Sequence, residues 1–230
     1  PAVVAMFLDE ARVALRLVHP NIVQSYQLGL LQGRHAIVME YLEGQPMQRV
    51  LLRAAASRRE LPYEVVVPMM ADALDGLHFA HEATADDGTP LRLVHRDVSP
   101  HNLFLTSDGR MKLLDFGIAK SEFQECRTRT GLLKGKVSYM APEQAWGQPV
   151  DRRADLWSVG VVLWEMLAGK RLFKAENEAA SLHNTLTAPV PKPTSVRDHI
   201  PAELERIVLR ALQRNPAERY PTAAAMASEL

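Results

Sequence analysis

A short polar segment, HRDVSPHN at 95–102, contains residue types that suit chemistry on a charged group. Asn102 follows Asp97 by five residues and leads directly into the apolar stretch 103–105. A polar loop next to such a stretch is typical of a functional loop that a rigid scaffold holds in place.

Further short motifs follow this segment in a fixed order: DFG at 115–117, APE at 141–143 and DLWSVG at 155–160. One such motif arises by chance, but the complete ordered set is the signature of protein kinases. The chain resembles the eukaryotic-like (Hanks-type) Ser/Thr protein kinases of bacteria, from residue 2 to its last residue. Other stretches also fit this family: HPNIV at 19–23, IVMEYLEG at 37–44 and RNPAERYPTA at 214–223.

The resemblance implies ATP and Mg²⁺ as cofactors and gives the polar side chains roles. Asp97 would accept or orient the proton of the substrate hydroxyl, and Asn102 and Asp115 would hold Mg²⁺ against the ATP phosphates. The five-residue spacing lets one loop face the nucleophile and the metal together. Taken singly, Asp97 and Asp115 would instead be turn or capping residues.

The resemblance also implies an adenine pocket. Met39 would border it, Glu40 and Leu42 would offer backbone groups to the adenine edge, and Phe104 would form its floor. Glu10 would pair with a lysine on a preceding strand. From the residues alone, Met39 and Phe104 are ordinary core residues and Glu10 is a solvated helix residue.

Other residues of these motifs are expected to be structural. His95 would pack near Phe116. Asp155 suits a helix N-cap, and the resemblance adds hydrogen bonds from the catalytic-loop backbone. Glu143 would form an ion pair with Arg219.

Composition suits a domain with a well-buried core, because 47% of the 230 residues are hydrophobic and 23% are charged. Basic and acidic residues balance at 27 each, so we expect neither nucleic acid nor a membrane surface as a partner. The single cysteine, Cys126, excludes an internal disulfide and suits a cytoplasmic location. No apolar run is long enough to span a membrane.

Periodicity predicts an α+β fold in which strands come early and helices late, as in the two-lobe protein-kinase-like fold. Strand pairs are expected at 22–31 with 35–41, and at 102–105 with 110–116. Helices are expected at 2–18, 47–58, 64–82, 155–168, 202–213 and 222–230. Gly169 would end the apolar helix that begins at Asp155.

The small lobe is expected to be incomplete. No glycine-rich loop and no strand with a VAIK-like lysine precede the first helix, so the first three strands of the small lobe would be absent. Residues 1–43 are then a remnant of that lobe, with a helix, two strands and a hinge. Residues 44–230 form a complete helical lobe. The chain is thus a domain truncated at its N-terminus, inactive alone.

Two positions depart from the Ser/Thr kinase pattern. Ser99 stands where these kinases have lysine in the catalytic loop, and Lys136 stands where they have threonine before the APE motif. We interpret the pair as a functional exchange, in which Lys136 reaches the same spot from the opposite wall. The alternative is that Lys136 points to solvent and Ser99 only fills space, as small residues do in tyrosine kinases.

The polar segment 121–137 is the expected place of regulation. Thr128 and Thr130 lie among arginines, and a phosphate there would bind Arg96 through charge-assisted hydrogen bonds. The alternative is an ordinary solvated loop.

The predicted function is transfer of the ATP γ-phosphate to Ser/Thr hydroxyls of protein substrates. One alternative is a non-catalytic pseudokinase that binds partners through the helical lobe. A small-molecule kinase is a third possibility, against which the APE motif and the long activation segment argue.

Overall fold

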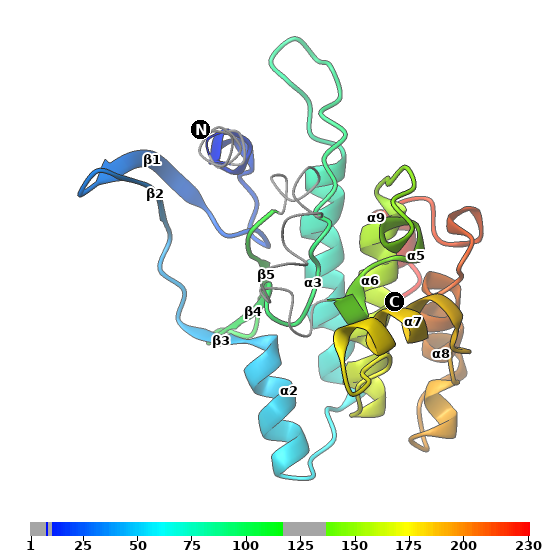
Figure 1. Cartoon of the computed structure of the whole chain (residues 1–230). Helices are drawn as coiled ribbons and strands as arrows, with labels where there is room; N and C mark the ends of the chain where they lie inside the picture. The colour runs from blue at the N-terminus through cyan, green and yellow to red at the C-terminus, as the bar shows by residue number, and fades with distance from the viewer. Residues whose placement is uncertain (1–7, 9–10, 117–136) are drawn as a thin grey trace.

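The computed structural model describes residue 8 and residues 11–116 and 137–230. A two-stranded arm projects from a mainly helical body, and a small second sheet lies where the arm joins the body (Figure 1). The expected α+β composition is confirmed. The division into lobes at residue 43 and the absence of three strands stay predictions.

The arm is an antiparallel hairpin of β1 (Ser25–Leu31) and β2 (Arg34–Met39). Gln32 and Gly33 join the strands with φ angles of 51° and 75°, the left-handed pair that a tight two-residue hairpin turn requires. The hairpin was predicted, although β1 begins three residues later than expected. Several of its large apolar side chains are exposed, among them Tyr26, Leu30, Leu31 and Val38.

A helical segment at 11–16 precedes the arm, and Leu8 is also helical. This agrees with the described part of the helix predicted at 2–18, except that the helix ends two residues earlier, at Arg16. The segment ends before His19 and Pro20, because proline disfavours helix at the residue that precedes it.

The second sheet has the order β3–β4–β5, with β3 at Gly44–Pro46, β4 at Leu103–Thr106 and β5 at Met111–Leu113. Both pairs are antiparallel. The β4–β5 hairpin was predicted. Strand β3 was not, since three residues containing glycine and proline carry no strand signal of their own. Gly44 is required there, because a Cβ atom would lie 2.1 Å from the Leu105 carbonyl oxygen.

Helices α2 (Met47–Ala56) and α3 (Tyr63–His81) follow the arm and agree with the predicted helices within two residues. One face of α3 is buried in the body, and Asp72 on this helix accepts the Met111 N–H of β5 at 3.0 Å. The α3 helix thereby supports the sheet that carries the candidate site.

Helix α6 (Arg153–Ala168) is the core of the body, and every residue from Ala154 to Ala168 is buried. Gly169 ends it in a left-handed conformation, as predicted. The prediction that Asp155 is its N-cap is wrong: the N-cap is Arg152, and Asp155 lies in the first turn.

Shorter helices surround α6, and Figure 1 shows α8 on the side away from the arm. Helices α8 (Ala202–Ala211) and α9 (Ala223–Ala227) lie within the predicted ranges. Two helices were missed, α5 (Pro142–Ala145) and α7 (Glu178–Thr187). The start of α7 had a usable signal, because the Asn177 side chain caps the Ala180 N–H at 2.8 Å.

Candidate active site

The polar segment 95–102 is fastened to α6 by one buried carboxylate. Asp155 accepts the backbone N–H groups of His95 and Arg96, each at 2.8 Å. It also accepts a hydrogen bond from His81 Nε2 at 2.8 Å. Burial alone would raise the pKa of Asp155, but the hydrogen bonds and the attraction of the two imidazoles outweigh burial and lower it. The expected bonds from the catalytic-loop backbone are confirmed, whereas His81 was not predicted.

Asn102 holds Asp97 within the loop. The Asn102 side-chain amide donates to the Asp97 backbone oxygen at 2.8 Å and to its Oδ2 at 2.9 Å. Asn102 is buried and Asp97 is half-buried, so this contact is shielded from competing water. The amide nitrogen is therefore committed to Asp97, which leaves Asn102 Oδ1 as the acceptor for another group.

Strand pairing brings Asp115 close to this loop. Leu103 of β4 is paired with Leu113 of β5, and the Leu114 N–H donates to the Asn102 backbone oxygen at 2.9 Å. Asp115 is the next residue along the chain. The two predicted metal ligands, Asn102 and Asp115, thus lie at the same end of one hairpin.

His95 links the loop to the residues around Asp115. Its ring lies 4.6 Å from the Phe116 ring, centroid to centroid, which confirms the predicted packing. Its Nε2 donates to the Leu114 carbonyl at 2.9 Å, and its Nδ1 accepts the Asp97 N–H at 3.3 Å. This pattern places a proton on Nε2, as expected for a structural histidine.

Two residues of the site have left-handed backbone conformations without being glycine. The φ angle is 64° at Arg96 and 42° at Asp115. Such conformations are unfavourable for residues with a Cβ atom and persist where the surrounding contacts impose them. Here those contacts are the bond from Arg96 N–H to Asp155 and the packing of Phe116.

The connection after β2 is tied to the second sheet through the Glu40 side chain. Glu40 Oε1 accepts Lys112 Nζ at 2.6 Å and the Gln24 N–H at 2.7 Å. The Glu40 N–H in turn donates to the Gln24 carbonyl at 2.9 Å. The sequence interpretation assigned only backbone groups of Glu40 to the adenine edge and missed this ion pair.

The other predicted adenine-pocket residues lie on both sides of this connection. Met39 ends β2 and is 43% exposed, and Leu42 follows three residues later in the chain. Phe104 lies on β4 opposite Lys112, the partner of Glu40. Lys112 therefore links the two residues, because it is paired with Phe104 across the sheet and forms an ion pair with Glu40. The adenine pocket itself stays a prediction.

Ser99 is fully buried, and its hydroxyl has no hydrogen-bond partner among the described residues. Its predicted counterpart Lys136 lies outside the described residues, as do Glu10, Thr128 and Thr130. The exchange between Ser99 and Lys136 stays a prediction.

The expected ion pair beyond the loop is present. Arg219 Nη1 and Nη2 donate to the two carboxylate oxygens of Glu143 at 2.7 and 2.8 Å, and both residues are buried. The neighbouring Gln144 donates to the Arg96 carbonyl at 3.2 Å and accepts the Ala141 N–H at the same distance. Gln144 therefore connects α5 to the catalytic loop, a role that the sequence did not reveal.

The donor set fits Mg²⁺. Asn102 Oδ1 and the exposed Asp115 carboxylate are oxygen ligands, and Mg²⁺ in nucleotide sites takes few protein ligands and completes its shell with phosphate and water. Within the described ranges, no group of three or more His, Cys, Asp or Glu side chains could hold a metal ion alone. In those same ranges, no helix is both long and apolar enough to cross a membrane.

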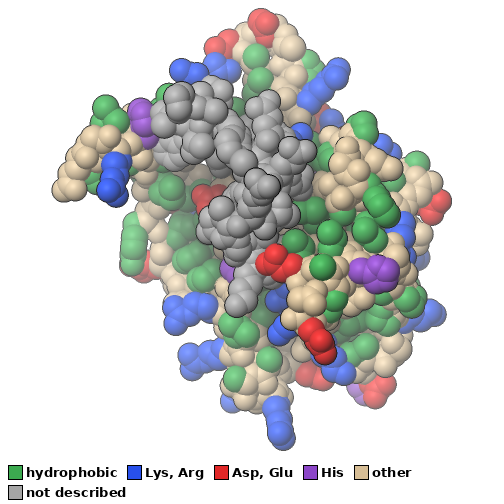
Figure 2. Space-filling model, in the orientation of Figure 1, with side chains coloured by type: hydrophobic (Ala, Val, Ile, Leu, Met, Phe, Trp, Pro, Cys, Tyr) green, Lys and Arg blue, Asp and Glu red, His purple; other side chains and the backbone are tan. Residues whose placement is uncertain are grey.

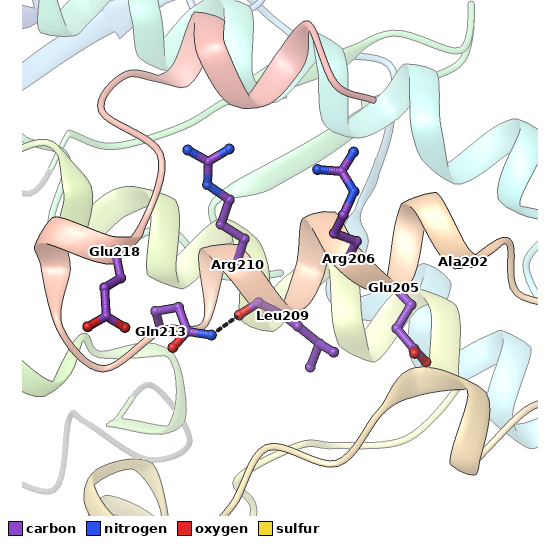
Figure 3. A pocket seen from close by; sticks show the side chains of 7 residues that line it. All are labelled: Ala202, Glu205, Arg206, Leu209, Arg210, Gln213 and Glu218. Atoms are coloured by element: carbon purple, nitrogen blue, oxygen red, sulfur yellow. Dashed lines mark hydrogen bonds between the residues drawn. The ribbon is translucent and has the colours of Figure 1, made fainter.

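A hollow of about 590 Å³ lies along α8, remote from the catalytic loop in sequence (Figure 3). Its lining includes Arg206 and Arg210, which form ion pairs with Glu229. None of its lining residues belongs to segment 95–102.

Comparison with known proteins agrees with this geometry. The model of the protein kinase domain family matches residues 4–230. Tyrosine-protein kinase MasK of Myxococcus xanthus is 50% identical over 230 residues, which is the whole chain and 36% of that protein. Serine/threonine-protein kinase PknL of Mycobacterium tuberculosis is 36% identical over 225 residues, or 97% of this chain and 53% of that protein. Serine/threonine-protein kinase Pkn1 of M. xanthus is 36% identical over 235 residues, or 100% of this chain and 32% of that protein. The chain thus spans from about a third to about half the length of these relatives.

Proposed function

Because the chain belongs to the protein kinase family, we propose that it supplies the catalytic loop of a protein serine/threonine kinase that transfers the ATP γ-phosphate to protein hydroxyls. The observation that carries this proposal is the Asn102 amide bound to Asp97 at 2.8 and 2.9 Å, beside the β4–β5 end that presents Asp115.

In this proposal, each residue has a positioning or electrostatic role. Asp97 orients the substrate hydroxyl and accepts its proton, while Asn102 fixes the Asp97 carboxylate. Asn102 Oδ1 and Asp115 would hold Mg²⁺, which would supply the positive charge that offsets the ATP phosphates. Glu40 and Leu42 face the adenine edge with backbone groups, beside Met39 and above Phe104.

Transfer to tyrosine is the second candidate, because the relative MasK is named a tyrosine-protein kinase and is 50% identical. Serine or threonine as acceptor is supported by PknL and Pkn1, which are both named serine/threonine kinases. Ser99 also favours this second candidate, since Ser/Thr kinases usually have lysine at this position and tyrosine kinases have a small residue. Phosphoamino-acid analysis of the phosphorylated product separates them directly.

The polypeptide 1–230 taken alone is expected to turn over ATP slowly. Its sequence contains no G-x-G-x-x-G loop that would cover the phosphates, and catalysis by positioning depends on such contacts. The test therefore uses the full-length protein that carries this chain.

The decisive experiment measures transfer of labelled phosphate from ATP by the full-length protein and by its Asp97→Asn variant. Loss of proton transfer lowers the rate by about 10²- to 10⁴-fold. Asp108→Asn, an exposed change in the β4–β5 turn, is the matched control and keeps the parent rate. A full-length protein that binds ATP but transfers no phosphate would instead support the pseudokinase alternative.

A further inference from the structure

A hollow of about 410 Å³ opens between α2, the loop that follows it and the C-terminal end of α6. Pro100 and Tyr139 line one side of it. The Pro100 carbonyl accepts the Gln48 N–H of α2 at 2.8 Å, so the helix that forms one wall is bound directly to the catalytic loop. Pro100 lies three residues from Asp97, a separation of at most about 11 Å along the chain. We call this hollow the α2–α6 pocket.

Basic side chains dominate the rim of the α2–α6 pocket. Arg58, Arg59 and Lys170 line it, are exposed and form no ion pair with any described residue. Figure 2 shows Lys and Arg side chains around the lower end of the molecule, where Figure 1 places α2. A cluster of exposed cations beside a hollow attracts a segment of opposite charge.

The acidic groups of the pocket are already paired. Glu165 accepts hydrogen bonds from Tyr139 Oη at 2.8 Å, Arg171 Nε at 3.0 Å and the Leu172 N–H at 3.0 Å. Burial raises the pKa of Glu165, although Arg171 opposes the shift. The Glu165 carboxylate is thus occupied by its hydrogen bonds and its ion pair with Arg171, and it offers little attraction to a cationic ligand.

The second acid, Glu60, is paired with Arg197 at 2.8 Å. Arg197 also donates to the carbonyls of Leu61 and Leu167 at 2.9 and 3.1 Å, so it is held in the wall. Because both acidic side chains of the pocket are paired, the charge of the pocket that remains unpaired by any described residue is the positive charge of Arg58, Arg59 and Lys170.

The wall of the pocket is apolar beneath this rim. Leu51, Leu52, Leu61, Met166 and Val196 contribute to it, and the Leu52 side chain is 62% exposed. An exposed leucine beside a hollow gains free energy when an apolar side chain covers it.

We propose that the α2–α6 pocket binds the protein substrate beside its acceptor residue, and that it selects a segment with acidic side chains and an aliphatic anchor. This inference rests on the proposed kinase function, because it treats the neighbouring catalytic loop as the site of transfer. The proposed substrates are proteins whose acceptor residue lies in an acidic, leucine-containing segment and not in a basic one.

The test measures peptide binding to the chain by fluorescence anisotropy, without any phosphate transfer. One fluorescein-labelled probe carries a single serine flanked by glutamates and leucines, and a second probe has lysine in place of every glutamate. We expect the acidic probe to bind roughly ten-fold more tightly at low ionic strength, and salt to reduce the difference. Equal affinity for the two probes would overturn the proposal.

Charge reversal inside the pocket gives the sharper comparison. Arg58→Glu together with Lys170→Glu should weaken the acidic probe roughly ten-fold and reverse the preference. The matched control, Arg49→Glu with Arg53→Glu, makes the same change in charge on the exposed face of α2 outside the pocket and should change affinity less than about two-fold. A similar loss in both double variants would show bulk attraction and contradict a defined pocket.

A third variant tests the apolar wall and does not depend on the charge reversals. Leu52 is surface-exposed, so the fold tolerates Leu52→Gln, and this uncharged change should weaken the acidic probe several-fold. Unchanged binding would remove the aliphatic anchor from the proposal. Because the readout is binding, a preference of the chain for the acidic probe, together with a full-length protein that transfers no phosphate, would contradict the kinase function and leave the pocket intact.

Discussion

The side-chain amide of Asn102 donates hydrogen bonds to both the backbone oxygen and the carboxylate of Asp97. The residue proposed as a metal ligand is thus also the residue that orients the proposed base. One side chain couples the position of the cation to the position of the proton acceptor.

Replacement of Asn102 is expected to damage both functions at once. Asn102→Ala removes a hydrogen bond to a charged group, worth about 1.5–3 kcal/mol, so transfer in the full-length protein should slow roughly 10- to 150-fold. The Mg²⁺ concentration that gives half-maximal rate should also rise. Steady-state assays over a Mg²⁺ series measure both effects, with Asn184→Ala on α7 as the control. An unchanged Mg²⁺ requirement would speak against Asn102 as a ligand.

Asp155→Asn is expected to destabilise the chain by about 2–5 kcal/mol, because an amide oxygen cannot accept all three buried N–H groups that the carboxylate serves. Urea unfolding at neutral pH measures this loss. Asp151→Asn, at the exposed entrance to α6, is the matched control and should change stability little.

The contribution of Asp155 should depend on pH in a defined direction. Its pKa is lowered in the folded state, so its stabilisation is complete above the usual value of 3.8 and is lost as the pH falls from that value through the lower pKa of the folded state. The stability difference between the parent and Asp155→Asn should therefore narrow as the pH falls below about 4. A difference that grows on acidification would contradict this assignment.

Arg219→Lys should be costly even though it keeps the charge. The guanidinium of Arg219 bonds both oxygens of Glu143 and three backbone carbonyls, a set that one ammonium group cannot satisfy. A loss of about 3 kcal/mol is expected, because Glu143 is left buried and poorly paired. Thermal unfolding measures it, and Arg206→Lys in an exposed pair should have little effect.

The exchange between Ser99 and Lys136 predicts a specific pattern in single-turnover kinetics of the full-length protein. Lys136→Thr alone should slow transfer roughly 10- to 150-fold, if a charge-assisted bond of about 1.5–3 kcal/mol is lost. Adding Ser99→Lys should restore most of the rate and give a large coupling energy in the double-mutant cycle. Additive effects, or a harmless Lys136→Thr, would leave Ser99 as a residue that only fills space.

The elements that could be predicted from the sequence are those specified by residues within the element itself. The arm, the β4–β5 hairpin and the apolar helix α6 follow from periodicity and from turn residues such as Gly33 and Gly169. The structure also confirms the contacts of His95 with Phe116 and of Glu143 with Arg219, which the family resemblance implied.

The features that were missed depend on distant parts of the chain. Strand β3 exists because the edge of β4 pairs with it, and nothing in Gly44–Pro46 itself specifies a strand. The ion pair of Glu40 with Lys112 joins residues 72 positions apart and follows only from the sheet register. Asp155 was placed at the helix N-cap by its type, whereas in the fold it serves amides of another segment.

The long-range bonds of the catalytic loop also set an order of assembly during protein synthesis. Asp155 is 60 residues downstream of His95, and Arg219 is 76 residues downstream of Glu143. A ribosome-bound chain that has released only the catalytic loop therefore lacks the carboxylate that orders it. Since translation proceeds at about 5–20 residues per second, the loop waits several seconds for its anchor. The catalytic loop can therefore take its final conformation only after Asp155 has been synthesised.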